Sequence, residues 1–558
     1  MATPKAPIAK ESSLQRFLVY LILVGSLLVT VVISPWNYDP VSVPKMTLLA
    51  LVAIFALILH LVISHHSDGL NTFNWILLVF VGLLVLNLFV NNYAFSERVF
   101  GVNGRNTGFV TYISFAILAF LLSRNFKFTD AGKVLISLFF CNLVVMCYYV
   151  AQRVGIDFIN ITEYYSRPSS TLGNPNYISG FLGFTILIPL LAYLINRRKT
   201  FLLIGLFTIP SNLFVIWDSQ SIQGIFAAAF SMFVLIGILL KSIKRLFWSY
   251  LLLSIGMGLI ALAGIIGKGP LATILNSTTL LSRFDYWRTA ISMTTSNPLF
   301  GVGLDGYGDY YRKYRDDVAF DRFGESSTSD TPHNVPLDFF ASGGFILGIY
   351  FLILLFFVYL KTVRILFSSV SPDFRVLGLF TLLNGYLIQS LVSPNQIGVG
   401  IWLWILMGAL AGSLVDIHEM GTYKLGAPKL NKSLRIGTKI LSIALLLMVI
   451  PFILVAQKND QQFLSAARST DGTKILQVIE TEPYDTKRFL LTQKAFSDSQ
   501  LHQYSLRVSR LGVAHNPNSY LLWKSIYENP TTPAEEKIRA RAEMKRLEPR
   551  FTEILSTG

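Results

Sequence analysis

Long apolar stretches alternate with short polar connections over most of the chain, from Leu14 to about Ala456. Most of these stretches hold about 20 residues, the length with which an α-helix crosses roughly 30 Å of hydrocarbon. We therefore predict an all-α, polytopic membrane protein with about thirteen transmembrane helices. The predicted spans are residues 15–34, 45–64, 73–92, 108–123, 134–152, 176–195, 200–217, 222–240, 246–266, 336–360, 375–392, 397–415 and 437–456.

The composition agrees with this pattern. The chain has 558 residues, of which 53% are hydrophobic and 14% charged, and its mean hydropathy is +0.53. An ordinary soluble domain is far less apolar and carries more charge. Basic residues flank the first span, but no small-residue cleavage site follows it, so we interpret this span as a retained signal anchor.

The basic residues gather in alternate connections. Lys and Arg number 47 against 32 Asp and Glu, a net charge of +15 that in a soluble protein would suggest a nucleic-acid partner. Here the positive-inside rule explains the excess, so we expect no nucleic acid. The rule predicts a multi-pass protein of the plasma membrane with a cytoplasmic N-terminus and an extracytoplasmic C-terminal tail. The intervening short connections hold only Lys45, Arg98, Arg105, Arg153 and Arg167. The predicted cytoplasmic set is Lys5, Lys10, Arg16, Arg124, Lys127, Lys133, Arg197, Arg198, Lys199, Lys241, Lys244, Arg245, Lys361, Arg364, Arg375, Lys424, Lys429, Lys432 and Arg435.

Two parts follow from this topology: a transmembrane domain at 1–456, whose large extracytoplasmic loop spans about 268–335, and a tail at 457–558. Prolines in the tail, at Glu482-Pro483, Asn516-Pro517 and Glu548-Pro549, recur at roughly the 34-residue period of tetratricopeptide (TPR) repeats. We predict a TPR-like helical tail, with a generic helical domain as the alternative.

A glycine-rich segment in the large loop has the Gly301-x-Gly303-x-x-Gly306 spacing of a dinucleotide loop. Such a loop needs a preceding strand and a βαβ unit. This one instead follows a helix-like segment between membrane spans. We therefore expect no nucleotide cofactor and predict that the glycines form a tight turn after the helix that carries Arg283.

Polar residues before two of the spans, and two arginines in the large loop, are candidates for a site. Asn176 is a plausible N-cap of the helix that follows it. His333 precedes another span, and taken alone it fits a capping or surface role. No second His, Cys or carboxylate stands near it at a ligand spacing, so we expect no metal site. Arg283 and Arg288 fall on different faces of one predicted helix.

Four segments occur in an order that resembles the O-antigen ligase and polymerase superfamily, polytopic glycosyltransferases of the bacterial envelope with a glycosyltransferase C-like fold. The segments are "RPSSTLGNPN" at 167–176, "RFDYWRTA" at 283–290, "NPLFGVGLDGYGDYY" at 297–311 and "PHNVPLDFFASGGFILG" at 332–348.

The resemblance implies that a glycan passes from a polyprenyl-diphosphate carrier to an acceptor hydroxyl at the outer face of the membrane, without metal or nucleotide. It makes Arg283 and His333 the catalytic candidates. Many members carry a Ser-Arg-Gly motif where this chain reads "DSQSIQG" at 218–224, so the missing cation would come from Arg167 or Arg288. The predicted substrate-binding residues are Arg167, Asn174, Asn176, Gln223, Arg288 and Asn334.

The chemistry fits these residue types. Arginine binds phosphate through a planar, permanently charged fork, and a histidine near neutrality can take the proton of a hydroxyl. Whether His333 is the base, which we favour, or a further diphosphate ligand stays open. So does the choice between ligase, polymerase and O-linked protein glycosyltransferase, and thus between lipid, glycan and protein acceptors. A flippase of lipid-linked glycans is the alternative of another class, although such transporters usually carry ionisable residues inside their spans.

Overall fold

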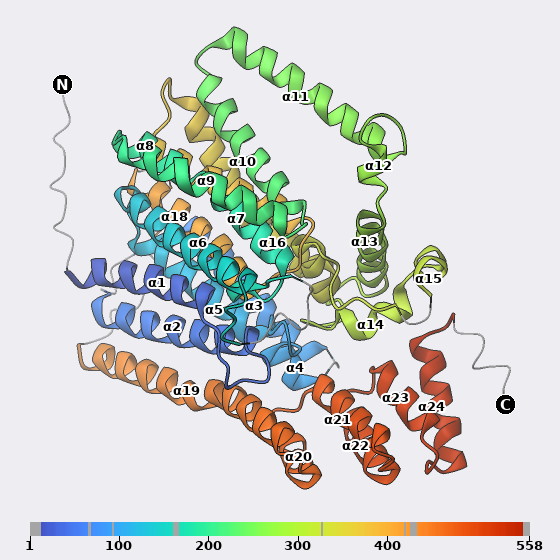
Figure 1. Cartoon of the computed structure of the whole chain (residues 1–558). Coiled ribbons are helices and arrows are strands. Elements are labelled where there is room, and N and C mark those ends of the chain that lie inside the picture. The colour runs from blue at the N-terminus through green and yellow to red at the C-terminus, as the bar shows by residue number, and fades with distance from the viewer. Residues whose placement is uncertain are drawn as a thin grey trace.

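The chain folds almost entirely into helices, which form one bundle with a large loop and a helical tail at the same end (Figure 1). The computed structural model describes residues 13–64, 69–91, 94–159, 167–324, 327–417, 420–423 and 432–550. Four basic positions used in the topology prediction, Lys5, Lys10, Lys424 and Lys429, lie outside these described residues.

The bundle, the loop and the tail follow each other along the chain. The bundle contains α1 (Ser13–Val31), α2 (Ser42–Ile63), α3 (Thr72–Val90), α4 (Phe95–Phe100), α5 (Phe109–Asn125), η1 (Phe128–Asp130), α6 (Ala131–Arg153), η3 (Ser170–Leu172), α7 (Pro175–Thr185), α8 (Ile188–Asn196), α9 (Thr200–Asp218), α10 (Gln223–Leu240), α11 (Lys244–Ile265), α16 (Val335–Ser368), α17 (Phe374–Ser390), α18 (Ile397–Asp416) and α19 (Lys432–Ser469). β1 (Leu70–Asn71) and β2 (Thr422–Tyr423) pair antiparallel. The loop holds α12 (Ala272–Leu275), α13 (Thr278–Ser296), α14 (Tyr307–Tyr314) and α15 (Asp317–Phe323), and the tail holds α20 (Gly472–Ile479), α21 (Thr486–Asp498), α22 (His502–His515), α23 (Tyr520–Glu528) and α24 (Ala534–Leu547).

Each predicted span coincides with helix, which confirms the all-α membrane fold. Among the described residues, 11 helical segments are long and apolar enough to cross a membrane. The other two predicted spans correspond to α5 and α17, each of 17 residues. The span predicted at 176–195 is divided into α7 and α8, with a proline in the first turn of α8. Proline suits the first turn of a helix, because the backbone N–H that it lacks would have no acceptor within the helix there.

Helix α18 forms the centre of the bundle. It is apolar all round, and its membrane-length window is completely buried. Its Trp402 donates a hydrogen bond from Nε1 to Thr30 Oγ1 of α1 at 2.9 Å, and that hydroxyl lies 2.9 Å from the Gly398 carbonyl. Helix α11 is equally apolar but exposed, with Leu252 72% accessible. An exposed apolar surface of this extent suits contact with lipid.

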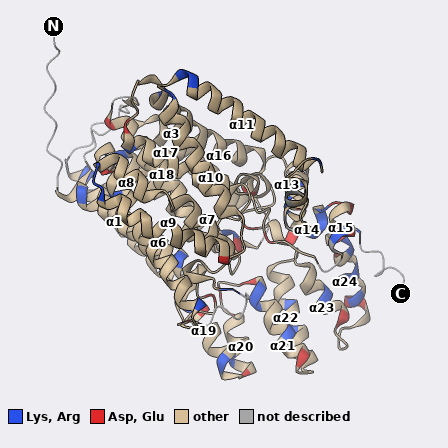
Figure 2. Ribbon diagram, turned by 45° about the horizontal axis from the view of Figure 1, so that its top comes forward, with Lys and Arg blue, Asp and Glu red and all other residues tan. Residues whose placement is uncertain are grey.

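The basic connections predicted to be cytoplasmic meet at one end of the bundle. Arg197 stacks over Phe374 at 4.7 Å and Arg375 over Phe128 at 4.9 Å, which brings together the ends of α8, α17 and η1. Lys241 Nζ donates to the Ser369 carbonyl at 2.7 Å. Figure 2 shows Lys and Arg at this end of the bundle, away from the tail. The side of the membrane on which this end lies stays a prediction.

Helix α16 breaks near its start, and the glycine-rich loop fills the break. Gly344 has φ 67° and ψ −168° inside the helix. The freed carbonyls of Ala341 and Ser342 accept hydrogen bonds from the N–H groups of Val302 at 2.9 Å and Gly303 at 3.0 Å. In return Phe345 N–H donates to the Pro298 carbonyl at 2.8 Å, so the loop satisfies the broken turn. We call these three hydrogen bonds the glycine clamp.

The glycines of the loop confirm the predicted turn only in part. Gly301 and Gly303 have φ values of 62° and 98°, the region that favours glycine. Gly306 has φ −77°, which any residue adopts. A Cβ on Gly301 would lie 2.3 Å from the Ala341 carbonyl oxygen, so this glycine is required by close approach as well as by its dihedral angles.

The tail is helical and packs on the large loop. Helices α21 and α22 lie between Pro483 and Pro517, and α23 and α24 lie between Pro517 and Pro549, as a repeat of helix pairs requires. The TPR assignment itself stays a prediction. The proposed boundary at 456 falls inside α19, which runs unbroken from the bundle into the tail.

Buried polar contacts hold the tail against the loop. Arg315 of the loop and Glu548 of the tail form an ion pair at 2.5 Å in which both side chains are fully buried. Asn516 Nδ2 donates to Asp309 Oδ2 at 2.6 Å, and Asn518 Nδ2 donates to Tyr310 Oη at 2.9 Å. The tail is therefore fixed in position and can form part of a site.

We expect Gly344→Ala to destabilise the protein, because a Cβ there would lie 2.6 Å from the Pro298 carbonyl oxygen at a positive φ. Backbone strain of this kind costs about 1–3 kcal/mol. Thermal unfolding of the detergent-solubilised protein measures the effect. The control is Gly82→Ala on α3, where a Cβ meets no atom within 4 Å and no loss is expected. Equal stability of the two variants would contradict the glycine clamp.

We expect Glu548→Ala to loosen the tail, since it leaves the Arg315 charge buried without its carboxylate. Removing one partner of a buried pair costs about 3–5 kcal/mol. The matched control is Asp317→Ala, which removes the 83% exposed partner of Arg550 in the same interface and should cost at most about 1 kcal/mol. Limited proteolysis of the two variants compares the release of the tail, and equal resistance would refute the role given to the pair.

Candidate functional site

Three of the four sequence segments meet around Tyr286 on α13, close to the start of α7, where the fourth segment ends. Its ring lies 5.3 Å from the His333 ring and 5.9 Å from the Tyr311 ring, and its carbonyl accepts a hydrogen bond from Tyr307 Oη at 2.8 Å. Arg283, one turn earlier on α13, interacts electrostatically with Tyr286 and with Tyr177 of α7. The loop helix, the glycine-rich segment, the start of α16 and the start of α7 thus converge on one place.

His333 lies in the last turn before α16, where it is mostly buried. Its φ of 52° is unusual for a residue with a side chain. Its Nδ1 lies 3.2 Å from the Thr331 carbonyl oxygen. Because a carbonyl can only accept, Nδ1 carries the proton, and Nε2 keeps the lone pair that can take up another.

Two effects keep this imidazole neutral. Burial, together with the positive charge of Arg283, lowers the pKa of His333 to about 4, although the nearby Asp330 acts in the opposite direction. The same interaction shows that the two predicted catalytic residues are electrostatic neighbours.

Arg283 makes no hydrogen bond or ion pair with any other residue that the structure describes. Burial lowers the pKa of its guanidinium, as expected for a partly desolvated cation without a counter-ion. The carboxylate of Asp285, only two residues away, is instead 2.5 Å from Arg288 and 2.5 Å from Arg322. The guanidinium N–H donors of this mostly buried arginine are therefore available to bind an anion.

A cleft of about 380 Å³ opens beside His333 between the large loop and the tail. Such a volume lies in the usual range of small-molecule sites, about 300–1,000 Å³. Tyr286 and His333 line one side of it, and the carboxylate of Asp330 is exposed there. The remaining lining residues are Gly308, Asp309, Arg312, Thr328, Ser329, Leu490, Ser519, Tyr520 and Leu521.

A buried ionic network behind the cleft was not predicted from the sequence. Arg105 lies 3.2 Å from Asp305 of the glycine-rich segment and 3.0 Å from Asp338 in the first turn of α16. It also donates to the Asp330 carbonyl at 2.5 Å. Although burial acts to lower it, these carboxylates raise the pKa of Arg105 well above its ordinary value. The network joins three chain segments that hold His333 in place.

A second polar cluster surrounds the start of α7. The Arg167 guanidinium donates to the Asp218 carbonyl, and the Gln223 side chain donates from Nε2 to the Asn176 carbonyl. Gln223 Oε1 has no hydrogen-bond partner among the described residues. Asn174, with Pro175 behind it, caps α7 by accepting the Asn176 N–H at 2.8 Å. The predicted N-cap, Asn176, was therefore wrong by two residues, because proline occupies the first helical position.

Two other predicted substrate-binding residues make structural contacts. Arg288 is exposed and lies 2.5 Å from Asp285 and 2.5 Å from Asp316, so its fork is occupied. Asn334 caps α16: its Oδ1 accepts the Leu337 N–H at 2.9 Å, and its Nδ2 donates to the Leu391 carbonyl at 3.0 Å.

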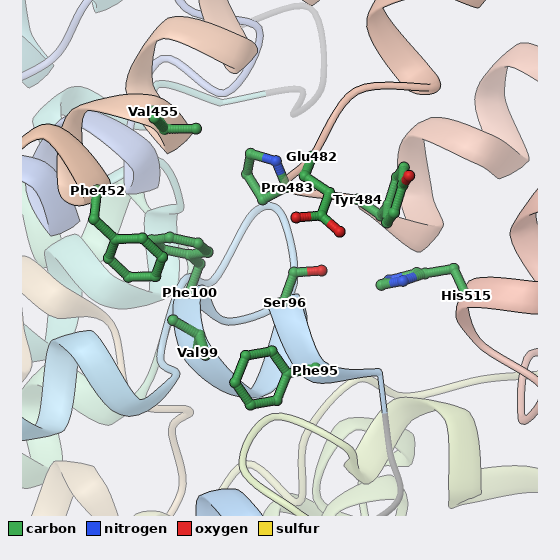
Figure 3. Close-up of a pocket in the computed structure, with 10 residues that line it drawn as sticks. All are labelled: Phe95, Ser96, Val99, Phe100, Phe452, Val455, Glu482, Pro483, Tyr484 and His515. Atoms are coloured by element: carbon green, nitrogen blue, oxygen red, sulfur yellow. The ribbon is translucent and has the colours of Figure 1, made fainter.

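A separate, mainly apolar pocket of about 280 Å³ lies between α4, α19 and the tail (Figure 3). Figure 3 shows Phe95, Phe100 and Phe452 on one side of it and His515 on the other. Neither Arg283 nor His333 lines this pocket. His333 lines the cleft between the large loop and the tail instead, whereas Arg283 lines neither of the two.

Comparison with known proteins supports the sequence resemblance. Residues 178–352 match the family model described as O-Antigen ligase. The matched segment contains Gln223, Arg283, Arg288, His333 and Asn334, whereas Arg167 and the tail lie outside it. No curated protein matches the chain. Residues 178–352 of this multi-pass membrane protein are thus similar to the O-antigen ligase family, and the match supports a place in the O-antigen ligase superfamily.

Proposed function

We propose that the protein transfers a glycan from a polyprenyl-diphosphate carrier to an acceptor hydroxyl at the outer face of the plasma membrane, as an O-antigen ligase does. The observation that carries this proposal is the pairing of Arg283, a mostly buried cation without a counter-ion, with His333, a neutral imidazole whose Nε2 can accept a proton. These are the two groups that departure of a diphosphate and activation of a hydroxyl require.

In the proposed reaction the acceptor oxygen attacks the anomeric carbon of the donor sugar. The bond between that carbon and the phosphate oxygen breaks, and polyprenyl diphosphate leaves with the electron pair. His333 Nε2 takes the proton of the acceptor hydroxyl, and Arg283 offsets the charge that develops on the leaving diphosphate. No other co-reactant is needed for the atoms and charges to balance.

Arg167 is the best candidate for a second cation at the diphosphate. It contacts Asp218, at the start of the segment in which many superfamily members carry an arginine, whereas the fork of Arg288 is already held by two aspartates. Arg167 precedes α7 and contacts Asp218 at the end of α9, whereas Arg283 interacts electrostatically with Tyr177 of α7. We therefore assign Arg167, rather than Arg288, to donor binding.

Binding of the donor would also activate the base. Arg283 lowers the pKa of His333, so a diphosphate that neutralises this charge raises the pKa toward its ordinary value. A stronger base would then form only in the donor complex.

Deletion of the gene, followed by analysis of lipid-linked and surface glycans, distinguishes the possible reactions. Full-length polymer left on the lipid carrier indicates a ligase, and single repeat units indicate a polymerase. Movement of labelled lipid-linked glycan between leaflets by the purified protein, with no new glycosidic bond, would refute the transferase and support a flippase.

We expect Arg283→Ala to reduce transfer by about 10²–10³-fold, the usual cost of removing one group that stabilises transition-state charge. Arg283→Lys keeps the charge but not the fork, and should recover only part of the activity. Transfer from the lipid-linked donor by purified protein is the measurement. Lys268→Ala, which removes an exposed cation from the same loop, is the control and should transfer normally. Normal transfer by Arg283→Ala would rule out its catalytic role.

We expect His333→Gln to lower kcat by about 10²–10⁴-fold, since glutamine can hydrogen-bond but cannot take up the proton. In the wild type the base acts when deprotonated, so a pKa of about 4 predicts that kcat/KM rises with pH near 4 and is level by pH 6.5. The pH dependence of kcat reports the donor complex, in which we propose a higher pKa for His333. The increase in kcat should therefore occur at higher pH than the increase in kcat/KM. A kcat/KM profile that rises only at or above pH 6.5 would contradict the neutral free imidazole.

A further inference from the structure

The tail forms one wall of the cleft that contains His333. Leu490 comes from α21, whereas Ser519, Tyr520 and Leu521 come from the start of α23. Arg312 of the large loop stacks over the Tyr520 ring at 4.7 Å, so this wall is in direct contact with the loop that carries Arg283 and His333. Neither the resemblance nor the family match assigns a role to this part of the chain.

A second hollow, of about 490 Å³, continues from the first along the tail. It lies between α21 and α23, and Leu490 and Leu521 line both hollows. A path therefore leads from His333, past these two leucines, to Asn529 at the end of α23. We call the two hollows together the tail groove.

Hydrogen-bonding side chains line the outer part of the tail groove. Gln493 and Ser497 supply an amide and a hydroxyl group, whereas the Ser525 hydroxyl already bonds to Ser509 and to the Leu522 carbonyl. The exposed Lys487 and Lys494 make no hydrogen bond or ion pair with the residues that the structure describes, whereas Lys524 is 3.7 Å from Glu528. Two cationic donors on the groove wall are therefore available to a ligand.

These features fit a glycan better than a peptide. Three common ways in which proteins bind peptides are adding a strand to a sheet edge, holding a helix in a hydrophobic groove and docking proline-rich segments on aromatic grooves. The described tail has no sheet edge, and no aromatic residue lines the hollow between α21 and α23. A chain rich in hydroxyl groups instead matches amide, hydroxyl and ammonium partners, each of which can donate or accept hydrogen bonds.

We propose that the tail groove is the acceptor site, and that it binds an extended glycan chain with its terminal hydroxyl at His333. The inference rests on the proposed transfer function and adds to it the class and the location of the acceptor. Leu521 and Lys494 are specificity-determining residues in this arrangement. They act on acceptor binding and take no part in the chemical step.

The test uses the full-length protein in lipid nanodiscs, with lipid-linked glycan extracted from the source cells as donor. The acceptor probes are size-fractionated oligosaccharides released from the surface polysaccharide of the same cells, and a Ser/Thr-rich peptide. Leu521→Trp obstructs the junction of the two hollows, and Lys494→Glu reverses one exposed charge without altering the packing. The controls are Ile538→Trp and Lys545→Glu on α24, both at exposed positions that do not line the groove.

For the wild type we expect the acceptor KM to fall as the oligosaccharide lengthens, until the chain fills the groove. Leu521→Trp should raise the KM for long oligosaccharides at least about tenfold, equivalent to 1.4 kcal/mol, and abolish the dependence on length. Lys494→Glu should raise it several-fold, while the donor KM and both control variants stay unchanged. A general structural defect would instead alter the donor KM as well.

Three results would overturn the proposal. If both groove variants keep the wild-type dependence on length, the acceptor binds elsewhere and the transfer function still stands. If the peptide accepts glycan and the oligosaccharides do not, the acceptor class is wrong. If the wild type transfers to neither probe while its donor is intact, the proposed function itself fails, and the inference with it.

Discussion

A helix that breaks within a membrane protein frees backbone N–H and C=O groups that only other protein groups can satisfy. Helix α16 breaks in this way at Gly344, and the glycine clamp supplies the partners. The clamp segment leads directly from α13, which carries Arg283, and the broken helix begins directly after His333. One set of backbone hydrogen bonds therefore fixes the relative position of the two candidate catalytic groups.

The distribution of carboxylates then decides which arginines are available to a substrate. Asp285 binds Arg288 and Arg322, Glu548 binds Arg315, and the Asp305 and Asp338 pair surrounds Arg105. Arg283 lies among these pairs without a described partner of its own. An unpaired cation in a partly dry site is costly to the folded state, as expected where function rather than stability determines the arrangement.

Hydropathy alone predicted the membrane helices, because the length and composition of a span are local properties. The contacts between distant segments could not be predicted in this way. Arg105 and Asp338 are separated by 233 residues, and no spacing rule connects them. The partners of the glycine loop are backbone groups, which leave no trace in residue type, although the turn itself was predictable. The true N-cap of α7 could have been predicted from the sequence. Pro175 favours the first helical position, which makes Asn174, the residue before it, the N-cap.

The pair formed by Arg315 and Glu548 also has a consequence for the biogenesis of the protein. The two residues are 233 positions apart, so Arg315 is synthesised well before Glu548. Until Glu548 has been synthesised, the Arg315 guanidinium has no carboxylate counter-ion in the folded loop. A chain truncated before α24 would therefore leave the Arg315 charge in the folded loop without its carboxylate, even with every membrane helix inserted.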